Sequence, residues 1–202
     1  EPATGIALLS ALEWPQILTT PHEALRWYER AAEENAAMPD AVAHARILRH
    51  CVLLEWLVGT SPSQRQATAE RAVEVARSSG DANEISRALA NLGACYRSAG
   101  RFDEAEAAFV EAYENPDRLS RPTANAVLRL WAVTDLQRGD VESARRRFLQ
   151  VARSERAGSE AHASALLNLG ELEYATGNVE AARDAARRAR ETYASLDSTY
   201  LI

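Results

Sequence analysis

One phrase of residues occurs twice in this chain, and a second phrase follows it each time. Leu89-Ala-Asn-Leu-Gly93 returns as Leu166-Leu-Asn-Leu-Gly170. The second phrase is Gly100-Arg-Phe-Asp-Glu-Ala105, which returns as Gly177-Asn-Val-Glu-Ala-Ala182, with the degenerate copy Gly139-Asp-Val-Glu-Ser-Ala144 between them. A unit that recurs every few tens of residues predicts a stacked solenoid. Solenoids present extended surfaces to partners, so the repeat favours binding over catalysis.

Apolar residues within each repeat follow a helical period. Leu89, Leu92 and Tyr96 lie at i, i+3 and i+7, which is the spacing of one helix face. Four such stripes are present: Leu89/Leu92/Tyr96/Ala99, Phe102/Ala105/Phe109/Ala112, Val141/Ala144/Phe148/Val151 and Val179/Ala182/Ala186/Ala189. No segment alternates apolar and polar residues over the length of a strand. The sequence therefore predicts an all-α fold.

Capping residues and glycines predict the ends of the helices. Three segments have the form of a capping box, namely Thr20-Pro-His-Glu23, Ser61-Pro-Ser-Gln64 and Asp81-Ala-Asn-Glu84. The closing glycines Gly59, Gly100, Gly139 and Gly177 are 41, 39 and 38 residues apart. We therefore expect a single array over residues 1–202, made of about five antiparallel helix pairs. The approximate repeats are 4–37, 39–79, 81–116, 120–155 and 159–196, and the helix 4–18 of the first is expected to kink at Pro15.

Charge and residue usage exclude several classes of function. The formal net charge is -6 and the pI is near 5.3, which argues against direct contact with nucleic acid. The chain contains no lysine, so a Walker-type phosphate loop is absent. The four histidines (His22, His44, His50 and His162) lack metal or triad spacing. We therefore expect no enzyme activity, no metal and no cofactor.

The cysteines and the hydropathy predict the compartment. Cys51 and Cys95 occupy apolar helical positions, so we expect two buried thiols in a reducing environment. No apolar run is long enough to span a membrane, and no signal peptide is visible. The expectation is a cytoplasmic fragment of a longer protein that contacts no membrane.

The central repeat carries a recognisable pattern. Its residues Leu92-Gly93…Tyr96…Ala105…Phe109…Ala112…Pro116 resemble the tetratricopeptide repeat, or TPR. The resemblance implies a right-handed superhelical solenoid in which Gly93 and Ala105 mark the touching point of a helix pair. It also implies that Tyr96 fills the core and that Phe109 packs against the next repeat. The other repeats depart from the pattern, with Asp135 and Glu173 at the tyrosine position and Ala186 at the phenylalanine position.

The length of the repeat period indicates which group of TPR proteins this chain resembles. Its 38–41 residues exceed the period of about 34 in the common TPR. Together with the opening Leu8-Leu-Ser-Ala-Leu-Glu-Trp14, this is similar to the TPR tail of large bacterial signalling ATPases and transcriptional regulators. The resemblance implies a sensor or assembly arm in a bacterial regulator.

The inner helices supply the candidate binding residues. In TPR arrays the first helix of each pair lines the concave groove, and its residues at places two, five, six, nine and twelve point inward. An asparagine there can pair with the N–H and C=O of an extended peptide, and arginines can clamp carboxylates. The predicted groove residues are Arg46, Arg49, Arg87, Asn91, Arg97, Arg129, Asn168, Glu171 and Tyr174, with His50 and Trp56 at two further inward places.

The predicted function is a non-catalytic protein–protein interaction scaffold that binds a peptide or protein segment in this groove. Two alternatives remain open. The array could be a homodimerisation module that uses Tyr200-Leu-Ile202 or the face at Leu8, Leu9 and Leu12. It could also be a small-ligand receptor with a pocket lined by Trp56 and Tyr174. A further interpretation is that the inward polar residues are solvated on a face that binds nothing.

Overall fold

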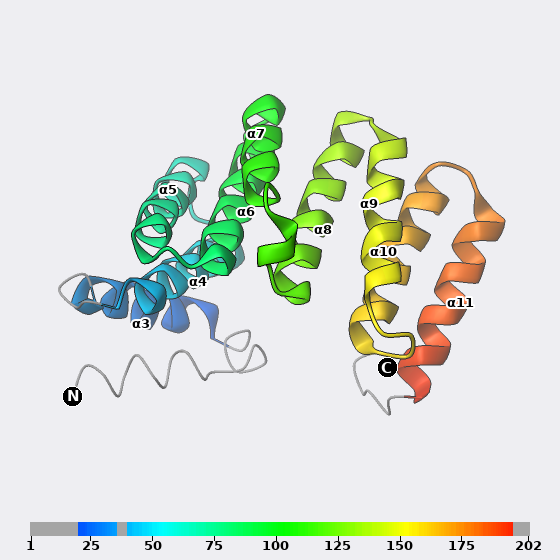
Figure 1. Cartoon of the computed structure of the whole chain (residues 1–202), viewed down its shortest axis with the longest axis horizontal. Coiled ribbons are helices and arrows are strands. Elements are labelled where there is room, and N and C mark those ends of the chain that lie inside the picture. Colours follow the sequence, from blue (N-terminus) through cyan, green and yellow to red (C-terminus); the bar gives the residue numbers. More distant parts are fainter. Residues whose placement is uncertain (1–19, 36–39, 196–202) are drawn as a thin grey trace. The chain divides into compact units, whose positions relative to one another are not determined.

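The computed structural model describes residues 20–35 and 40–195, and these ranges are helical with no strand (Figure 1). This confirms the all-α prediction. The predicted helix 4–18 with Pro15, the face at Leu8, Leu9 and Leu12, and Tyr200–Ile202 lie outside the described residues. The elements are α3 (Pro21–Asn35), α4 (Ala41–Val58), α5 (Pro62–Ser79), α6 (Ala82–Ser98), α7 (Phe102–Ala112), the 3₁₀ turn η1 (Pro116–Arg118), α8 (Arg121–Arg138), α9 (Val141–Ser154), α10 (Glu160–Ala175) and α11 (Val179–Ser195).

Side-chain caps begin many of these helices. The oxygens of Ser61 and Asp81 accept hydrogen bonds from the third backbone N–H that follows, at 3.2 and 2.9 Å. Asp40, Asp140 and Ser159 cap α4, α9 and α10 in the same way. Each such bond satisfies a backbone donor that a helix start would otherwise leave unpaired. At the other end of α4, Gly59 adopts a φ of 77°, which a side chain would disfavour.

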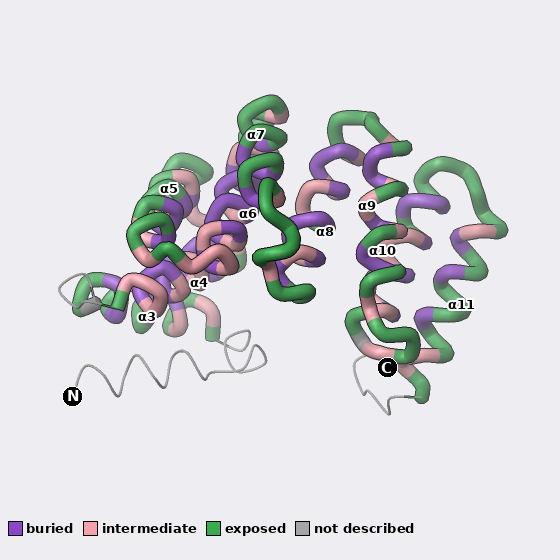
Figure 2. The backbone as a smooth tube through the Cα atoms, in the orientation of Figure 1, coloured by how far each residue is buried: buried purple, intermediate pink, exposed green. Residues whose placement is uncertain are grey.

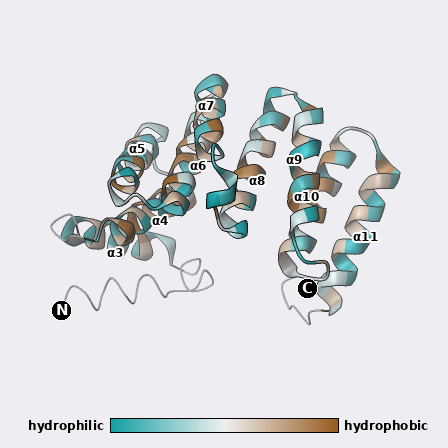
Figure 3. Ribbon diagram, viewed as in Figure 1, coloured by the Kyte–Doolittle hydropathy of each residue, from teal (hydrophilic) through white to brown (hydrophobic). Residues whose placement is uncertain are grey.

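Consecutive helices pack as antiparallel neighbours. The pairs are α4 with α5, α6 with α7, and α10 with α11, and in addition α4 contacts α6 directly. The chain divides into two compact units between Thr123 and Ala124, which is a point inside α8. Unit 1 holds α3 to α7, and unit 2 holds most of α8 together with α9 to α11. Within both units, buried and exposed positions alternate along each helix, and the hydropathy alternates with them (Figures 2 and 3).

The core of unit 1 includes a close contact between a glycine and an aromatic ring. Phe109 and Ala105 are fully buried. A Cβ atom added at Gly93 would lie 2.9 Å from the tip of the Phe109 ring. The nearest neighbour of Gly93 is therefore the ring of its own helix pair. The Phe109 ring thus closes the pair of α6 and α7, and its predicted contact with the next repeat stays a prediction.

The core of unit 2 is built from small and medium side chains. One cluster joins Ala132, Ala144, Phe148 and Leu172 from α8, α9 and α10. A second joins α10 and α11 through Ala163, Leu166 and Ala189. The apolar stripes predicted burial wrongly at three positions, because Ala99, Val179 and Ala186 are exposed. Ala99 directly follows the last residue of α6, and Val179 is the first residue of α11.

Both cysteines are buried and unpaired, as predicted. Burial raises the pKa of the Cys95 thiol to about 11 and raises that of Cys51 as well, so both stay protonated at neutral pH. None of the described helices is both long and apolar enough to cross a bilayer. In the same residues no three His, Cys, Asp or Glu side chains gather as a metal site would require. The two thiols act as packing groups.

Candidate functional site

Four of the predicted groove residues lie together in unit 1, where α4 packs against α6. They are Arg46, Arg49, Arg87 and Asn91. The two arginines from α4 share one carboxylate of α6. Arg46 donates from Nε and Nη2 to Glu84 Oε1 at 3.2 and 3.1 Å, and Arg49 donates from Nε to Glu84 Oε2 at 3.4 Å. The side chain of Glu84 is only 6% exposed, whereas that of Arg46 is 42% exposed. We call this surface the α4/α6 face; its residues are Arg46, Arg49, His50, Glu84, Arg87 and Asn91.

Sequence reasoning assigned Glu84 a different role. Its position in Asp81-Ala-Asn-Glu84 predicted a capping box, in which the glutamate side chain would return to the N–H of Asp81. The structure keeps one half of the box, because Asp81 accepts from the Glu84 N–H. The N–H of Asp81 instead donates to Ser79 Oγ at 3.1 Å, which leaves the Glu84 carboxylate for the two arginines. The sequence did contain a signal for this contact. Arg46 and Arg49 lie three residues apart on the same side of a helix, and such a pair requires an acidic partner when that side is packed against another helix.

Asn91 and Arg87 complete the face, and both also bind the protein itself. Asn91 Nδ2 donates to the carbonyl oxygen of Arg49 at 3.5 Å, which links α6 to α4. Arg87 Nε donates to Thr123 Oγ1 at 2.9 Å, and Thr123 is completely buried. Arg87 is therefore partly a structural residue. The amide oxygen of Asn91 accepts no hydrogen bond within the part of the chain that the structure describes.

The α4/α6 face carries excess positive charge. Three guanidinium groups, from Arg46, Arg49 and Arg87, stand against the single carboxylate of Glu84. Burial and these three cations together lower the pKa of His50 to about 4, so its imidazole is neutral at pH 7. Burial also lowers the pKa of Arg49, which the nearby Glu84 opposes. The arrangement suits an anionic group such as a carboxylate, which can accept paired N–H donors from arginine.

Two inward positions of unit 1 lie outside this cluster. Arg97 stands near the end of α6, and its Nε is buried with no hydrogen-bond partner among the residues described. Burial lowers the pKa of its guanidinium. Trp56 is covered by the guanidinium of Arg65, whose Cζ lies 4.2 Å from the ring centroid. One face of the Trp56 ring is thus occupied by a neighbour.

The predicted residues of unit 2 do not form a comparable cluster. Arg129 is exposed on α8, and Asn168 is half-buried on α10. Glu171 and Tyr174 are exposed, the tyrosine to 72%. Within the described residues of this unit, no hydrogen bond joins any of these four side chains to another. Their role in binding stays a prediction.

Acidic residues replace the repeat's tyrosine at two positions of unit 2, and each has an arginine partner. Glu173, which is 6% exposed, receives Arg145 Nε on Oε1 at 2.6 Å and Arg145 Nη2 on Oε2 at 3.1 Å. These bonds lower the pKa of the Glu173 carboxyl. Asp135 pairs with Arg147, whose guanidinium also stacks 3.7 Å above Trp131. Both departures from the repeat pattern are therefore compensated within the fold.

Comparison with known proteins identifies the repeats and the fold. No curated protein matches the chain in sequence. The solved structure of BtubC (BKLC) from P. vanneervenii is similar with a TM-score of 0.66 and 16% identity, over 90% of this chain and 76% of that one. Two further matches are Rap proteins. The Rap conjugation gene regulator of plasmid pLS20, in complex with the Phr* peptide, has a TM-score of 0.69 and 18% identity over 89% of this chain.

A Rap protein complexed with Competence and Sporulation Factor has a TM-score of 0.77 and 15% identity over 89% of this chain. The chain spans about half the length of these two Rap proteins, at 50% and 51%. At such identities the likeness shows the fold alone. Family models described as the tetratricopeptide repeat match residues 66–117 and 129–196, which together make up more than half of the sequence. The chain is therefore built from tetratricopeptide repeats in an all-helical, solenoid-type fold.

Proposed function

We propose that the chain is a protein-interaction domain that binds an extended, acidic or carboxylate-ended segment of a partner on the α4/α6 face. The observation that supports this most directly is the charge of that face. Arg46 and Arg49 share Glu84, and Arg87 adds a third guanidinium nearby. A ligand carboxylate can use the exposed Arg46 without separating Glu84 from Arg49.

The amide of Asn91 offers the second element of recognition. An extended peptide presents N–H and C=O groups that must be satisfied on binding. The amide oxygen of Asn91 is available as an acceptor. The hydrogen bond from Asn91 Nδ2 to the carbonyl oxygen of Arg49 is long, at 3.5 Å, so it is weak enough to be replaced by a bond to the peptide. Two structures of similar fold were solved with the Phr* peptide and with Competence and Sporulation Factor, which supports a peptide partner for this fold.

The test begins with a selection. A displayed library of random twelve-residue peptides with free carboxyl ends is selected against the unmodified chain, and the enriched peptides are synthesised. We expect acidic peptides, and we expect Asn91→Ala to weaken their binding about tenfold, because an unmet hydrogen bond costs about 1–3 kcal/mol. Arg46→Ala should weaken binding and reduce its dependence on salt.

The matched control is Arg118→Ala, which removes an exposed arginine outside the α4/α6 face. It should bind the selected peptides as tightly as the parent. Arg87→Glu is a poor first choice, because it would also break the bond to buried Thr123. Peptides that bind the parent, Arg46→Ala and Asn91→Ala equally would place the site elsewhere, for example at Arg129, Asn168, Glu171 or Tyr174 in unit 2.

We further propose that the domain is the sensor or assembly arm of a larger cytoplasmic bacterial regulator, in which residues 1–202 form a single array. Support comes from the long repeat period and from the Rap proteins, of which the chain spans about half the length. The test has two parts. The sequence of the intact gene shows which other domains the protein contains, and a reporter gene under the control of the intact regulator shows whether changes in this domain alter regulation. A gene that encodes no regulatory or signalling domain would contradict this role.

A further inference from the structure

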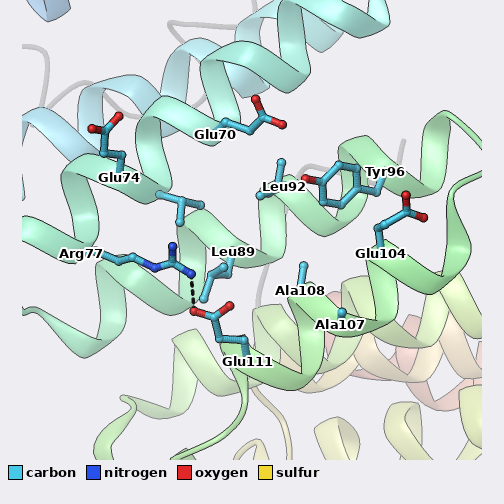
Figure 4. Close-up of a pocket in the computed structure, with 11 residues that line it drawn as sticks. Glu70, Glu74, Arg77, Leu89, Leu92, Tyr96, Glu104, Ala107, Ala108 and Glu111 are labelled. Carbon is cyan, nitrogen blue, oxygen red and sulfur yellow. Dashed lines mark hydrogen bonds and ion pairs between the residues drawn. The ribbon is translucent and has the colours of Figure 1, made fainter.

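A second surface of unit 1 lies between the two outer helices. A cleft of about 540 Å³ opens between α5 and α7, with α6 beneath it. Figure 4 shows Leu89 and Leu92 of α6 between the two helices, and Ala107 and Ala108 on α7. The volume is within the range of roughly 300–1,000 Å³ that is typical of ligand pockets. It leaves room for one or two large apolar side chains.

The rim of the cleft is acidic. Glu70 and Glu74 come from α5, and Glu104 and Glu111 come from α7. All four are exposed. Arginine partners neutralise only the two on α7: Glu111 pairs with Arg77 at 2.6 Å, and Glu104 pairs with Arg101 at 2.9 Å. Among the described residues Glu70 and Glu74 form no ion pair, so the rim retains negative charge.

Polar contacts join α5 and α7 at both ends of the cleft. At one end Arg77 reaches across to Glu111, and Figure 4 shows this bond. At the other end Arg101 Nη1 donates to Gln66 Oε1 at 3.2 Å. The ten residues of α7 between these ends span about 15 Å, which is the length of about three helical turns. The Arg77–Glu111 pair is 57% and 46% exposed, so it contributes little and can be exchanged for a partner's cation.

We propose that the α5/α7 cleft docks a basic amphipathic segment of a partner protein, in which arginine or lysine residues flank a large apolar side chain. The apolar side chain fills the space over Leu89 and Leu92. The flanking cations pair with Glu70 and Glu74, which form no ion pair with any of the described arginines. The segments 1–19 and 196–202 do not match this chemistry, because they contain no arginine or lysine.

The cleft is distinct from the proposed α4/α6 site, although both use residues of α6. Its charge is of the opposite sign, and its walls are the second helices of two repeats, whereas the α4/α6 face uses the first helices. One chain could thus hold an acidic segment on one surface and a basic segment on another.

The probe for the test is a fluorescein-labelled synthetic peptide of arginine, alanine and leucine, in which each leucine is flanked by arginines. Its matched copy has glutamine in place of each arginine, because an acidic copy could bind to the α4/α6 face. We expect the parent chain to bind the basic peptide and not the glutamine copy, as read by fluorescence anisotropy. Ala107→Trp, at an exposed position that lines the cleft, should weaken binding tenfold or more by filling the space.

The double exchange Glu70→Arg/Glu74→Arg should also weaken binding tenfold or more. Its matched control is Glu33→Arg/Glu34→Arg on α3, which makes the same change of charge away from the cleft. Both this control and Arg46→Ala should bind the basic peptide as the parent does. If the control weakens binding as much as the cleft variant, the peptide is attracted by the net negative charge of the chain and not by the cleft, and the proposal is wrong.

Two other outcomes would also overturn the proposal. One is a parent chain that does not bind the basic peptide, or that binds the glutamine copy equally well. The other is a parent that sediments as a dimer and becomes a monomer on Glu70→Arg/Glu74→Arg, since that would assign the cleft to a second copy of this chain. Circular dichroism of each variant confirms folding, and the charge variant decides the question if Ala107→Trp fails to fold.

Discussion

One buried carboxylate holds the α4/α6 face together. Glu84 is 6% exposed and binds Arg46 and Arg49, which come from a helix 35 to 38 residues earlier in the chain. Removing one partner of a buried pair leaves the other charge without compensation, at a cost of about 3–5 kcal/mol. Local pattern could identify Asp81-Ala-Asn-Glu84 as a helix start. It could not identify the arginines that the glutamate would meet, because that contact depends on how two repeats stack.

His50 makes the same face sensitive to acid. Its pKa is about 4 in the folded chain, against a reference value of about 6.5. Because the unfolded state binds the proton more tightly, the stabilisation is complete above about pH 6.5 and is lost as the pH falls towards 4. At pH 5 the loss is on the order of 2 kcal/mol.

The measurement is the free energy of unfolding in urea at pH 7 and at pH 5. We expect His50→Gln to lose less stability than the parent between these two values. The matched control, His22→Gln, changes an exposed histidine on α3 and should keep the parent's dependence. A parent whose stability falls no more than that of His50→Gln would contradict the buried, neutral state of His50.

At the scale of helices, most of the fold could be predicted from local sequence. Caps such as Ser61 and closing glycines such as Gly59 act within one turn, so the sequence defines them directly. The apolar stripes identify the buried side of each helix for the same reason. What they leave open is the identity of the neighbour. Gly93 was expected to lie where the helices of its pair touch, and the pattern did not show that its close neighbour there is the Phe109 ring.

The two helix-packing glycines should respond differently to alanine. A Cβ at Gly93 would lie 2.9 Å from the fully buried Phe109 ring, so one of the two helices or the ring itself would have to shift. Overpacking costs about 1–3 kcal/mol, against a gain of about 1 kcal/mol in helix propensity. We therefore expect Gly93→Ala to lower the melting temperature of the chain.

Gly170 supplies the matched control. Its added Cβ would stand 3.4 Å from the carbonyl oxygen of Ala182 and from the Cβ of Ala185, which is an ordinary contact. Gly170→Ala should therefore leave the melting temperature unchanged or raise it, as followed by circular dichroism at 222 nm. Equal losses from the two variants would show that the α6–α7 contact is no tighter than the α10–α11 contact.

At the scale of the whole molecule, the repeat pattern predicts the architecture better than it predicts the site. The tetratricopeptide matches over 66–117 and 129–196 follow the phrases that the sequence repeats. The predicted groove was read from the same positions in every repeat. Among the described residues, only Arg46, Arg49 and Asn91 form a hydrogen-bonded cluster around Glu84, and no counterpart of Glu84 gathers Arg129 or Asn168 there. Identical register does not ensure identical chemistry when the intervening residues differ.

The proposal of a single array makes a prediction about how far a local change spreads. The two compact units meet at Thr123 and Ala124, inside the continuous helix α8. Stability in a solenoid is a sum of repeat terms and nearest-neighbour terms, and helix formation is itself cooperative. Loosening unit 1 should therefore loosen α8, and through α8 the helices of unit 2 that pack in the same cluster as Ala132.

Gly93→Ala is the change that tests this coupling. Hydrogen exchange measured by mass spectrometry should become faster in peptides from α6 and α7, and also in peptides from α8 and α9. The effect should decrease with distance along the chain and be smallest in α11. Gly170→Ala should not accelerate exchange in any of these helices. If Gly93→Ala accelerates exchange only before Thr123, and urea unfolds the chain in two separate transitions, then the two units are independent domains and residues 1–202 do not form one cooperative array.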